Sequence, residues 1–172
     1  MTDYPMHEID CPRCIRAVSK DMDVTITDRP ELRIAGIRHI GAYAEIGREF
    51  GRLGGLLKGA PPAGSQMIAV YHDNPDVTVT DQLRSDAALT LVGDVRAPDG
   101  LIERRVPAGR YAKTVHKGGY EGLPSTWNAL KSDWLATSGH RMGSPSYEVY
   151  VNNPMATPKD ELITEIYLRL AD

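Results

Sequence analysis

The sequence predicts an α+β fold in which two β-β-α-β-β copies pack about a pseudo-twofold axis and share one sheet. The first observation is a repeat, because residues 70–91 and 149–170 align without a gap. The second is an upstream continuation of this repeat at a slightly different offset. The third is an apolar stripe with helical spacing at the same place in both copies. A copy of about 70 residues has little core of its own, so the two copies are expected to bury their helical stripes together.

The repeat has an offset of 79 residues in its later part and 77 residues in its earlier part. Nine residues recur identically in the later part: Val70, Tyr71, Asn74, Pro75, Thr78, Asp81, Leu83, Leu89 and Leu91. Six recur in the earlier part: Pro30, Arg33, Ala35, His39, Gly41 and Tyr43. The offset changes within "GAPPAGSQ" and "ATSGHRMGSP", whose compositions are typical of loops that tolerate insertion.

Each copy is predicted to run strand, strand, helix, strand, strand. The first copy covers residues 22–93, with strands in "DVTITD", "LRIAGIRHI", "MIAVYH" and "DAALTLV" and a helix over 43–58. The second covers residues 101–170, with strands in "LIERRV", "GRYAKTVHK", "SYEVYV" and "ELITEIYLRL" and a helix over 120–138. "APDG" is the expected turn between the copies, and residues 1–21 form an N-terminal arm.

The two helices are predicted from apolar residues at i, i+4, i+7 and i+11, which lie on one face of a helix. These residues are Ile46, Phe50, Leu53 and Leu57 in the first copy and Leu123, Trp127, Leu130 and Trp134 in the second. Gly54 and Gly55 weaken the first helix, since each glycine costs about 1 kcal/mol of helix propensity. His39 and His116 precede the two helices at equivalent positions, which favours a structural hydrogen bond near each helix start.

Carboxylates and tyrosines alternate with apolar residues along the last strands of both copies. Because successive residues of a strand face opposite sides, one set is expected to gather on one face near the pseudo-axis. The set is Glu165, Glu148, Tyr150 and Tyr167, with Asp86 and Tyr71 as counterparts in the first copy. Acids walled by tyrosine rings suit an organic cation. The alternative is a solvated sheet face on which acids and tyrosines maintain solubility.

Composition limits the remaining functions. The formal net charge is −3 and no basic run stands out, which disfavours nucleic-acid binding. The sequence shows no apolar stretch long enough for a membrane span and no signal-peptide pattern, so a cytoplasmic protein without a membrane partner is expected. No cofactor motif is present. His7, Cys11 and Cys14 are weak candidates for a metal site, and the alternative is an N-terminal arm with two free thiols.

Three stretches, "IAVYHDNPD", "WLATSGHRMGSPSYEVYVNNP" and "ELITEIYLRL", resemble the GyrI-like small-molecule-binding family. The resemblance covers roughly residues 22–170 and implies tandem SHS2 modules that share an antiparallel sheet, with a ligand groove between them. It implies that Glu165 is the characteristic acid of this groove. It also implies that aromatic residues line the walls, namely Tyr120, Trp127, Tyr150 and Tyr167.

The resemblance implies a protein that binds small hydrophobic or cationic molecules and protects the cell from toxic compounds. About twenty residues precede the first predicted strand, which is too short for a helix-turn-helix domain, so a stand-alone member without direct DNA binding is expected. One alternative is a hydrolase of strained, cyclopropane-bearing electrophiles, with Glu165 as general base and Tyr150 or Tyr167 as donor. Another is inhibition of DNA gyrase by direct protein contact. The ligand and the oligomeric state are left open.

Overall fold

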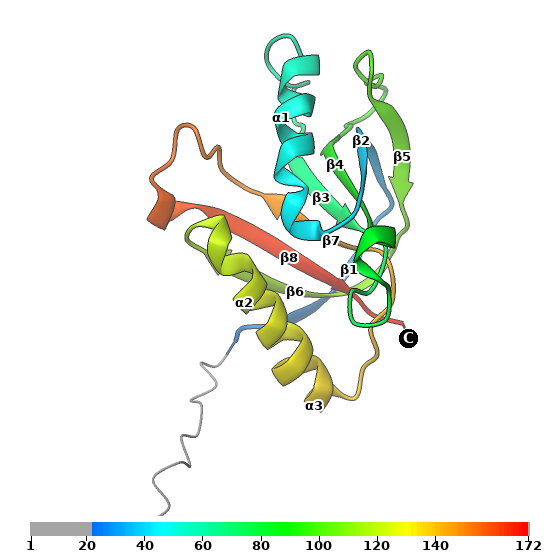
Figure 1. Ribbon diagram of the computed structural model, residues 1–172, viewed down its shortest axis with the longest axis vertical. Coiled ribbons are helices and arrows are strands. Elements are labelled where there is room, and N and C mark those ends of the chain that lie inside the picture. Colours follow the sequence, from blue (N-terminus) through cyan, green and yellow to red (C-terminus); the bar gives the residue numbers. More distant parts are fainter. Residues whose placement is uncertain (1–21, 172) are drawn as a thin grey trace, which may run out of the picture.

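Every element of the first half of the chain has a counterpart in the second half. The computed structural model describes residues 22–171 (Figure 1). The first half contains β1 (Thr25–Arg29), β2 (Leu32–Ile40), η1 (Tyr43–Glu45), α1 (Gly47–Leu56), β3 (Met67–Tyr71), η2 (Thr80–Gln82) and β4 (Arg84–Thr90). The second contains β5 (Ile102–Val106), β6 (Gly109–Lys117), η3 (Tyr120–Gly122), α2 (Leu123–Asn128), η4 (Ala129–Leu135), α3 (Ala136–Ser138), β7 (Ser146–Tyr150), η5 (Lys159–Glu161) and β8 (Ile163–Arg169). The strand bounds repeat at the two offsets of the sequence, which confirms the predicted duplicated α+β fold.

The strands form one eight-stranded antiparallel sheet in the order β1-β6-β8-β7-β3-β4-β2-β5. This order is a palindrome when each strand is replaced by its counterpart, and its centre is the pair β7 and β3. The outer strands are exchanged, because β1 pairs with β6 of the second copy and β5 pairs with β2 of the first. The sequence does not reveal this exchange, which adds two further pairings between the copies.

Two helical segments cover one face of the sheet, one over each half, as the sequence predicts (Figure 1). The central residue of each apolar stripe is fully buried, Leu53 in α1 and Leu130 in η4. Leu53 packs in a cluster with Ala35 and Leu89, and Leu130 packs in a separate cluster with Ala112 and Leu168. Because each helix has its own core, a space is left between them above β3 and β7.

Residues 120–138 form one continuous helical segment, over the range predicted from sequence. Its middle section, η4, is a π-helix, and Gly139 ends the segment in the left-handed conformation with φ 78°. His116 Nε2 lies 3.0 Å from the carbonyl oxygen of Gly119, and His39 Nε2 lies 3.1 Å from that of Ala42. These contacts confirm the expected histidine hydrogen bonds near the helix starts.

A third cluster lies on the opposite face of the sheet, and it joins the two copies. It contains Ile34, Ile68, Val70, Ala88, Val106, Tyr111, Tyr147, Val149 and Tyr167. The rings of Tyr147 and Tyr167 stack at 4.7 Å between centroids, and Arg29 lies 4.7 Å above the Tyr167 ring. Both faces of the central strands are therefore buried.

The copy boundaries 22–93 and 101–170 stay predictions, and the N-terminal arm, residues 1–21, lies outside the described residues. Within those residues, no helix has the length and apolar character needed to cross a membrane.

Truncating either central leucine is expected to destabilise the whole domain by a similar amount. Leu53→Ala and Leu130→Ala should each lower the free energy of unfolding by about 2–5 kcal/mol, because each leaves a cavity in a closed core. Leu56→Ala, at a position 37% exposed on the same helix as Leu53, is the matched control and should cost less than about 1 kcal/mol. Urea denaturation should show one transition for every variant, since the exchanged strands connect the copies. Two separate transitions would contradict this coupling.

Candidate functional site

A cavity of about 980 Å³ lies between the two helical segments and over the central strands. Its aromatic lining comes in three pairs related by the repeat: Tyr43 and Tyr120, Phe50 and Trp127, Tyr71 and Tyr150. Their rings contact one another across the cavity, with Tyr71 and Trp127 6.0 Å apart and Phe50 and Tyr150 5.4 Å apart between centroids. The pseudo-twofold arrangement therefore encloses the cavity with aromatic rings from both copies.

Glu148 on β7 is the carboxylate at the floor of this cavity. Glu148 is only 2% exposed, and it pairs across the centre of the sheet with Ala69 of β3. Ala69 and Glu148 are also equivalent positions of the repeat. A glutamate at both positions would bring two carboxylates together near the pseudo-axis, where they repel. The alanine leaves room for a single acid.

Three neutral donors hold the Glu148 carboxylate. The Tyr71 hydroxyl donates to Oε2 at 3.0 Å, the Tyr150 hydroxyl donates to the same oxygen at 2.8 Å, and the indole N–H of Trp127 donates to Oε1. Two of these donors come from adjacent central strands and the third from the second helix, so Glu148 depends on the packing of both copies. Within residues 22–171, no lysine, arginine or histidine forms a salt bridge with this carboxylate.

Burial dominates the electrostatics of this group. Loss of hydration raises the pKa of Glu148, and the hydrogen bonds from Trp127, Tyr150 and Tyr71 oppose that effect only in part. Burial also raises the pKa values of Tyr71 and Tyr150 well above their usual range, and the neighbouring carboxylate adds to this. Both hydroxyls therefore keep their protons and act as donors. His116 also acts on Glu148 through its charge and lowers its pKa, but it forms no salt bridge with Glu148.

The predicted gathering of all four second-copy residues on one face is wrong. β7 pairs Val149 with Glu165 and Tyr147 with Tyr167, so Glu165 and Tyr167 point away from the face that carries Glu148 and Tyr150. Neither of them lines the cavity. Alternation fixes faces within a strand, but the register between strands decides which faces match, and a shift of one residue exchanges them.

Glu165 is instead part of the opposite face. Its carboxylate binds Lys113 Nζ at 2.6 Å and accepts a hydrogen bond of 2.7 Å from the Tyr167 hydroxyl. Partial burial disfavours the charged form, but Lys113 and Tyr167 outweigh it and lower the pKa of Glu165. The assignment of Glu165 as the groove acid, which the family resemblance implied, is therefore wrong, and Glu148 lines the cavity instead.

Asp86 lies on the same far face as its counterpart Glu165. It pairs with Val70, and its carboxylate contacts His72 Nε2 at 2.6 Å and Arg38 Nε at 2.6 Å. The expectation that Asp86 faces the groove is therefore wrong. Five of the eight proposed ligand residues do line the cavity: Tyr71, Tyr120, Trp127, Glu148 and Tyr150.

Sequence reasoning missed Tyr43, Phe50 and Lys131 as lining residues. The repeat itself carried the signal for two of them, because Tyr43 aligns with Tyr120 and Phe50 aligns with Trp127. Lys131 has no such signal, since its counterpart is Gly54.

The metal candidates His7, Cys11 and Cys14 lie outside the described residues. From residue 22 to residue 171, no group of three or more histidine, cysteine, aspartate or glutamate side chains could hold a metal ion.

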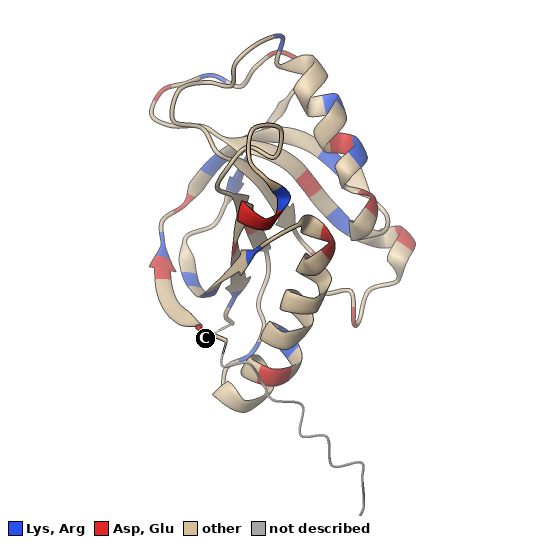
Figure 2. Cartoon of the chain, turned by 90° about the vertical axis from the view of Figure 1, so that its left-hand side faces the viewer, with Lys and Arg blue, Asp and Glu red and all other residues tan. Residues whose placement is uncertain are grey.

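Acidic and basic residues are interspersed around α1, where Arg52 pairs with Glu49 at 2.7 Å (Figure 2).

Comparison with known sequences gives one family and several named relatives. The family described as GyrI-like small molecule binding domain matches residues 22–171. A DNA gyrase inhibitor of Yersinia enterocolitica is 30% identical over 141 residues, which cover 78% of this chain and 90% of that protein. A DNA gyrase inhibitor of Salmonella typhi is 27% identical over 139 residues, covering 78% and 90%.

Solved structures share the fold at low sequence identity. The C-terminal domain of EcmrR superimposes with a TM-score of 0.71 at 17% identity, covering 88% of this chain and 98% of that chain. SAV2435 bound to tetraphenylphosphonium gives a TM-score of 0.62 at 14% identity, covering 87% and 94%. A hydrolase from Listeria innocua gives 0.59 at 12% identity, covering 87% and 92%.

The raised pKa of Glu148 gives a pH dependence of stability with a defined sign. The folded state holds this proton more tightly than the unfolded chain, so the contribution of Glu148 to stability is lost as pH rises through its raised pKa. The free energy of unfolding of the parent minus that of Glu148→Gln should therefore fall with pH, starting near pH 4.5, the ordinary pKa of glutamate. Urea denaturation at a series of pH values measures it.

Glu165→Gln is the matched control for this measurement. Because the pKa of Glu165 is lowered, its contribution to stability should grow as pH rises, and should do so below pH 4.5. The same sign for both variants would contradict the assignment of opposite environments.

Proposed function

The chain belongs to the GyrI-like small molecule binding domain family, and from this premise we propose that its cavity binds hydrophobic organic cations with Glu148 as the counter-charge. The observation that carries the proposal is a buried carboxylate that has three neutral donors and no ionic partner among residues 22–171. A bound cation would supply the positive charge that compensates this carboxylate, which burial has removed from water.

The walls suit such a ligand. Tyrosine and tryptophan faces attract cations, and the cavity offers six aromatic side chains from the two copies. A volume of about 980 Å³ lies at the upper end of the range for drug-sized ligands, roughly 300–1,000 Å³. The presence of tetraphenylphosphonium in a chain with the same fold supports this ligand class. Binding of this kind would protect a cell by sequestering toxic lipophilic cations.

Replacing Glu148 should weaken binding of tetraphenylphosphonium, a permanent lipophilic cation. Glu148→Gln keeps the shape and a hydrogen-bond acceptor but removes the charge, so the dissociation constant should rise about tenfold or more. Isothermal titration calorimetry measures it, and the melting temperature of the parent should rise with ligand concentration.

Glu165→Gln makes the same chemical change on the neighbouring strand but on the opposite face of the sheet. It should leave the dissociation constant within about twofold of the parent value, a change below about 0.5 kcal/mol. A large effect of Glu165→Gln together with none of Glu148→Gln would overturn the proposal and restore the assignment made from sequence.

The hydrolase hypothesis changes its residues with the structure. A general base in the cavity would be Glu148, whose pKa is raised by burial, and the donor to a developing oxyanion would be Tyr150 or Tyr71. Glu165 cannot act on a ligand there, because it lies on the other face of the sheet. Hydrolysis stays a hypothesis for this chain, and cation binding uses the same groups without a reaction.

A second candidate function is inhibition of DNA gyrase by protein contact, which the names of the curated relatives favour. If it holds, the purified protein should lower gyrase supercoiling activity in proportion to its concentration. Glu148→Gln should inhibit equally well, because this side chain is buried and cannot reach a protein surface. Full supercoiling at a large molar excess of folded protein would exclude this function.

A further inference from the structure

Lys131 is the only cationic side chain that lines the cavity in the described part of the chain. It lies in η4, its side chain is 16% exposed, and its Nζ lies 2.5 Å from Asp76 Oδ2. Asp76 belongs to the loop between β3 and β4, and its side chain is 63% exposed. The ion pair thus joins the helix of one copy to a loop of the other at one end of the cavity.

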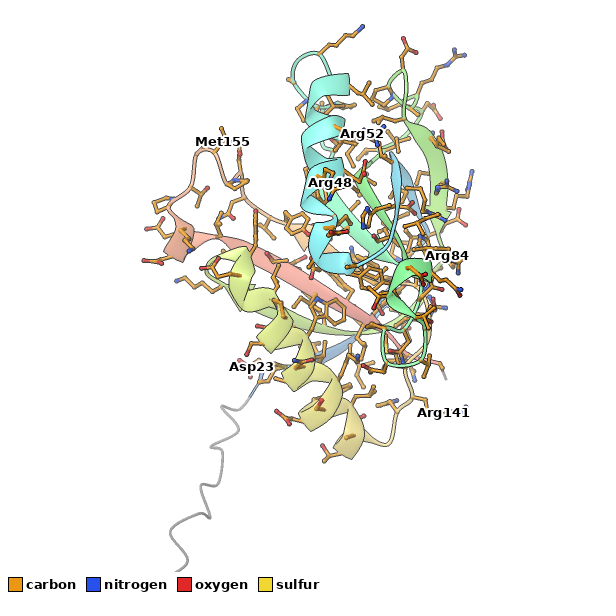
Figure 3. All side chains as sticks on the ribbon, in the orientation of Figure 1. Asp23, Arg48, Arg52, Arg84, Arg141 and Met155 are labelled. Carbon is orange, nitrogen blue, oxygen red and sulfur yellow. The ribbon has the colours of Figure 1, made fainter. Side chains whose placement is uncertain are left out.

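The repeat does not reproduce this pair at the other end. The counterpart of Lys131 is Gly54, and the counterpart of Asp76 is Met155 in the loop between β7 and β8. Met155 lines the cavity and is 92% exposed, and Figure 3 places it at the far end of its loop. The Asp76 end of the cavity therefore carries an ion pair that the Met155 end lacks, so a ligand meets different chemistry at each end.

The other charges of the lining do not compete for Lys131. The carboxylate of Asp73 forms two hydrogen bonds with the side chain of Arg84, at 2.8 and 3.0 Å, and its pKa is lowered by this partner. Glu148 is held by its three neutral donors. Lys131 is left with Asp76, a partner outside the cavity lining.

Asp76 and Lys131 differ in how well water can hydrate them when the ion pair separates. Asp76 is exposed, so its carboxylate regains full hydration when it leaves the ammonium group, and exposed ion pairs contribute little to stability. The Lys131 side chain is mostly buried in the cavity wall, so its ammonium group is favoured by an anion beside it. A ligand carboxylate can therefore replace Asp76 at small cost.

The spacing along the helix fits a ligand with two charges. Trp127, which donates to Glu148, precedes Lys131 by four residues, so the two side chains share a face of the helical segment. Four residues are about one turn of this segment, and Trp127, Lys131 and Glu148 all line the same cavity. A single ligand in the cavity can therefore contact both Glu148 and Lys131.

We propose that the cavity prefers zwitterions, namely hydrophobic cations that carry a carboxylate on a short linker, with Glu148 binding the cation and Lys131 the carboxylate. This inference rests on the proposed cation site and adds a second charged subsite to it. The competing interpretation is that Lys131 serves only to fasten the loop of Asp76. Under that interpretation a ligand carboxylate meets Glu148 and Asp76 and is repelled.

The test compares carboxybutyl-triphenylphosphonium with its methyl ester by isothermal titration calorimetry at neutral pH. The two share one cation and one linker, and the ester replaces the carboxylate with a neutral group that is larger by one methyl. The free acid should bind the parent protein about threefold to tenfold more tightly than the ester, the scale of one partly buried charge pair. Lys131→Gln should abolish or invert this preference. Asp76→Asn should enlarge it, because it removes the competing carboxylate.

The ester is the internal control for each variant, since the ratio of acid to ester dissociation constants is compared within one protein, and the melting temperature of each variant reports its folding. An ester that binds the parent more tightly than the acid overturns the zwitterion inference, and so does an acid preference that Lys131→Gln leaves unchanged. In either case, loss of ester binding in Glu148→Gln still supports the cation site. If ester binding is insensitive to Glu148→Gln, the proposed function itself fails.

Discussion

The chemistry of the cavity depends on the burial of one carboxylate beside the pseudo-twofold axis. Glu148 and Ala69 are equivalent in the repeat and are paired in the sheet, so the axis relates an acid to an alanine. Two acids there would repel, and two alanines would leave an apolar floor. The duplicated fold thus supplies a symmetric frame, and a single difference at its centre gives the cavity its charge.

Burial disfavours the charged form of that carboxylate, and the hydrogen bonds around it oppose this effect only in part. Tyr71 and Tyr150 are equivalent residues on adjacent strands, and both donate to the same oxygen of Glu148. Trp127 completes the set from the helix, at the position where the first copy has Phe50, which offers no donor. Three hydrogen bonds orient the group without neutralising it, so under the proposed function the acceptor is already in place before a cation binds.

The sequence predicted the fold well because the repeat supplied independent information twice. The helix over residues 120–138 was predicted correctly, although its π-helical middle was not. The central leucines of both helical stripes proved to be core, while Phe50 and Trp127 line the cavity. The site was predicted only in part. The sequence correctly placed Glu165 and Tyr167 on one face of β8. Which face of β7 matches that face depends on the register between the two strands, and no local sequence pattern contains the register. Both sheet faces are buried here, so burial could not distinguish the ligand face from the other one.

The exchange of β1 and β5 limits how the two copies can move around the cavity. Each helix lies over strands whose edge is closed by a strand of the other copy. A rotation of one copy against the other must therefore break main-chain hydrogen bonds at the outer pairs as well as at the central pair. Adaptation to ligands of different shape is then left to the helices, the aromatic side chains and the two β-β loops. Of these loops, the one that contains Asp76 is fastened to η4 by Lys131, while the one that contains Met155 lacks this ion pair. Under the zwitterion proposal, the end with Lys131 therefore orients the ligand, and the end with Met155 supplies no such charge.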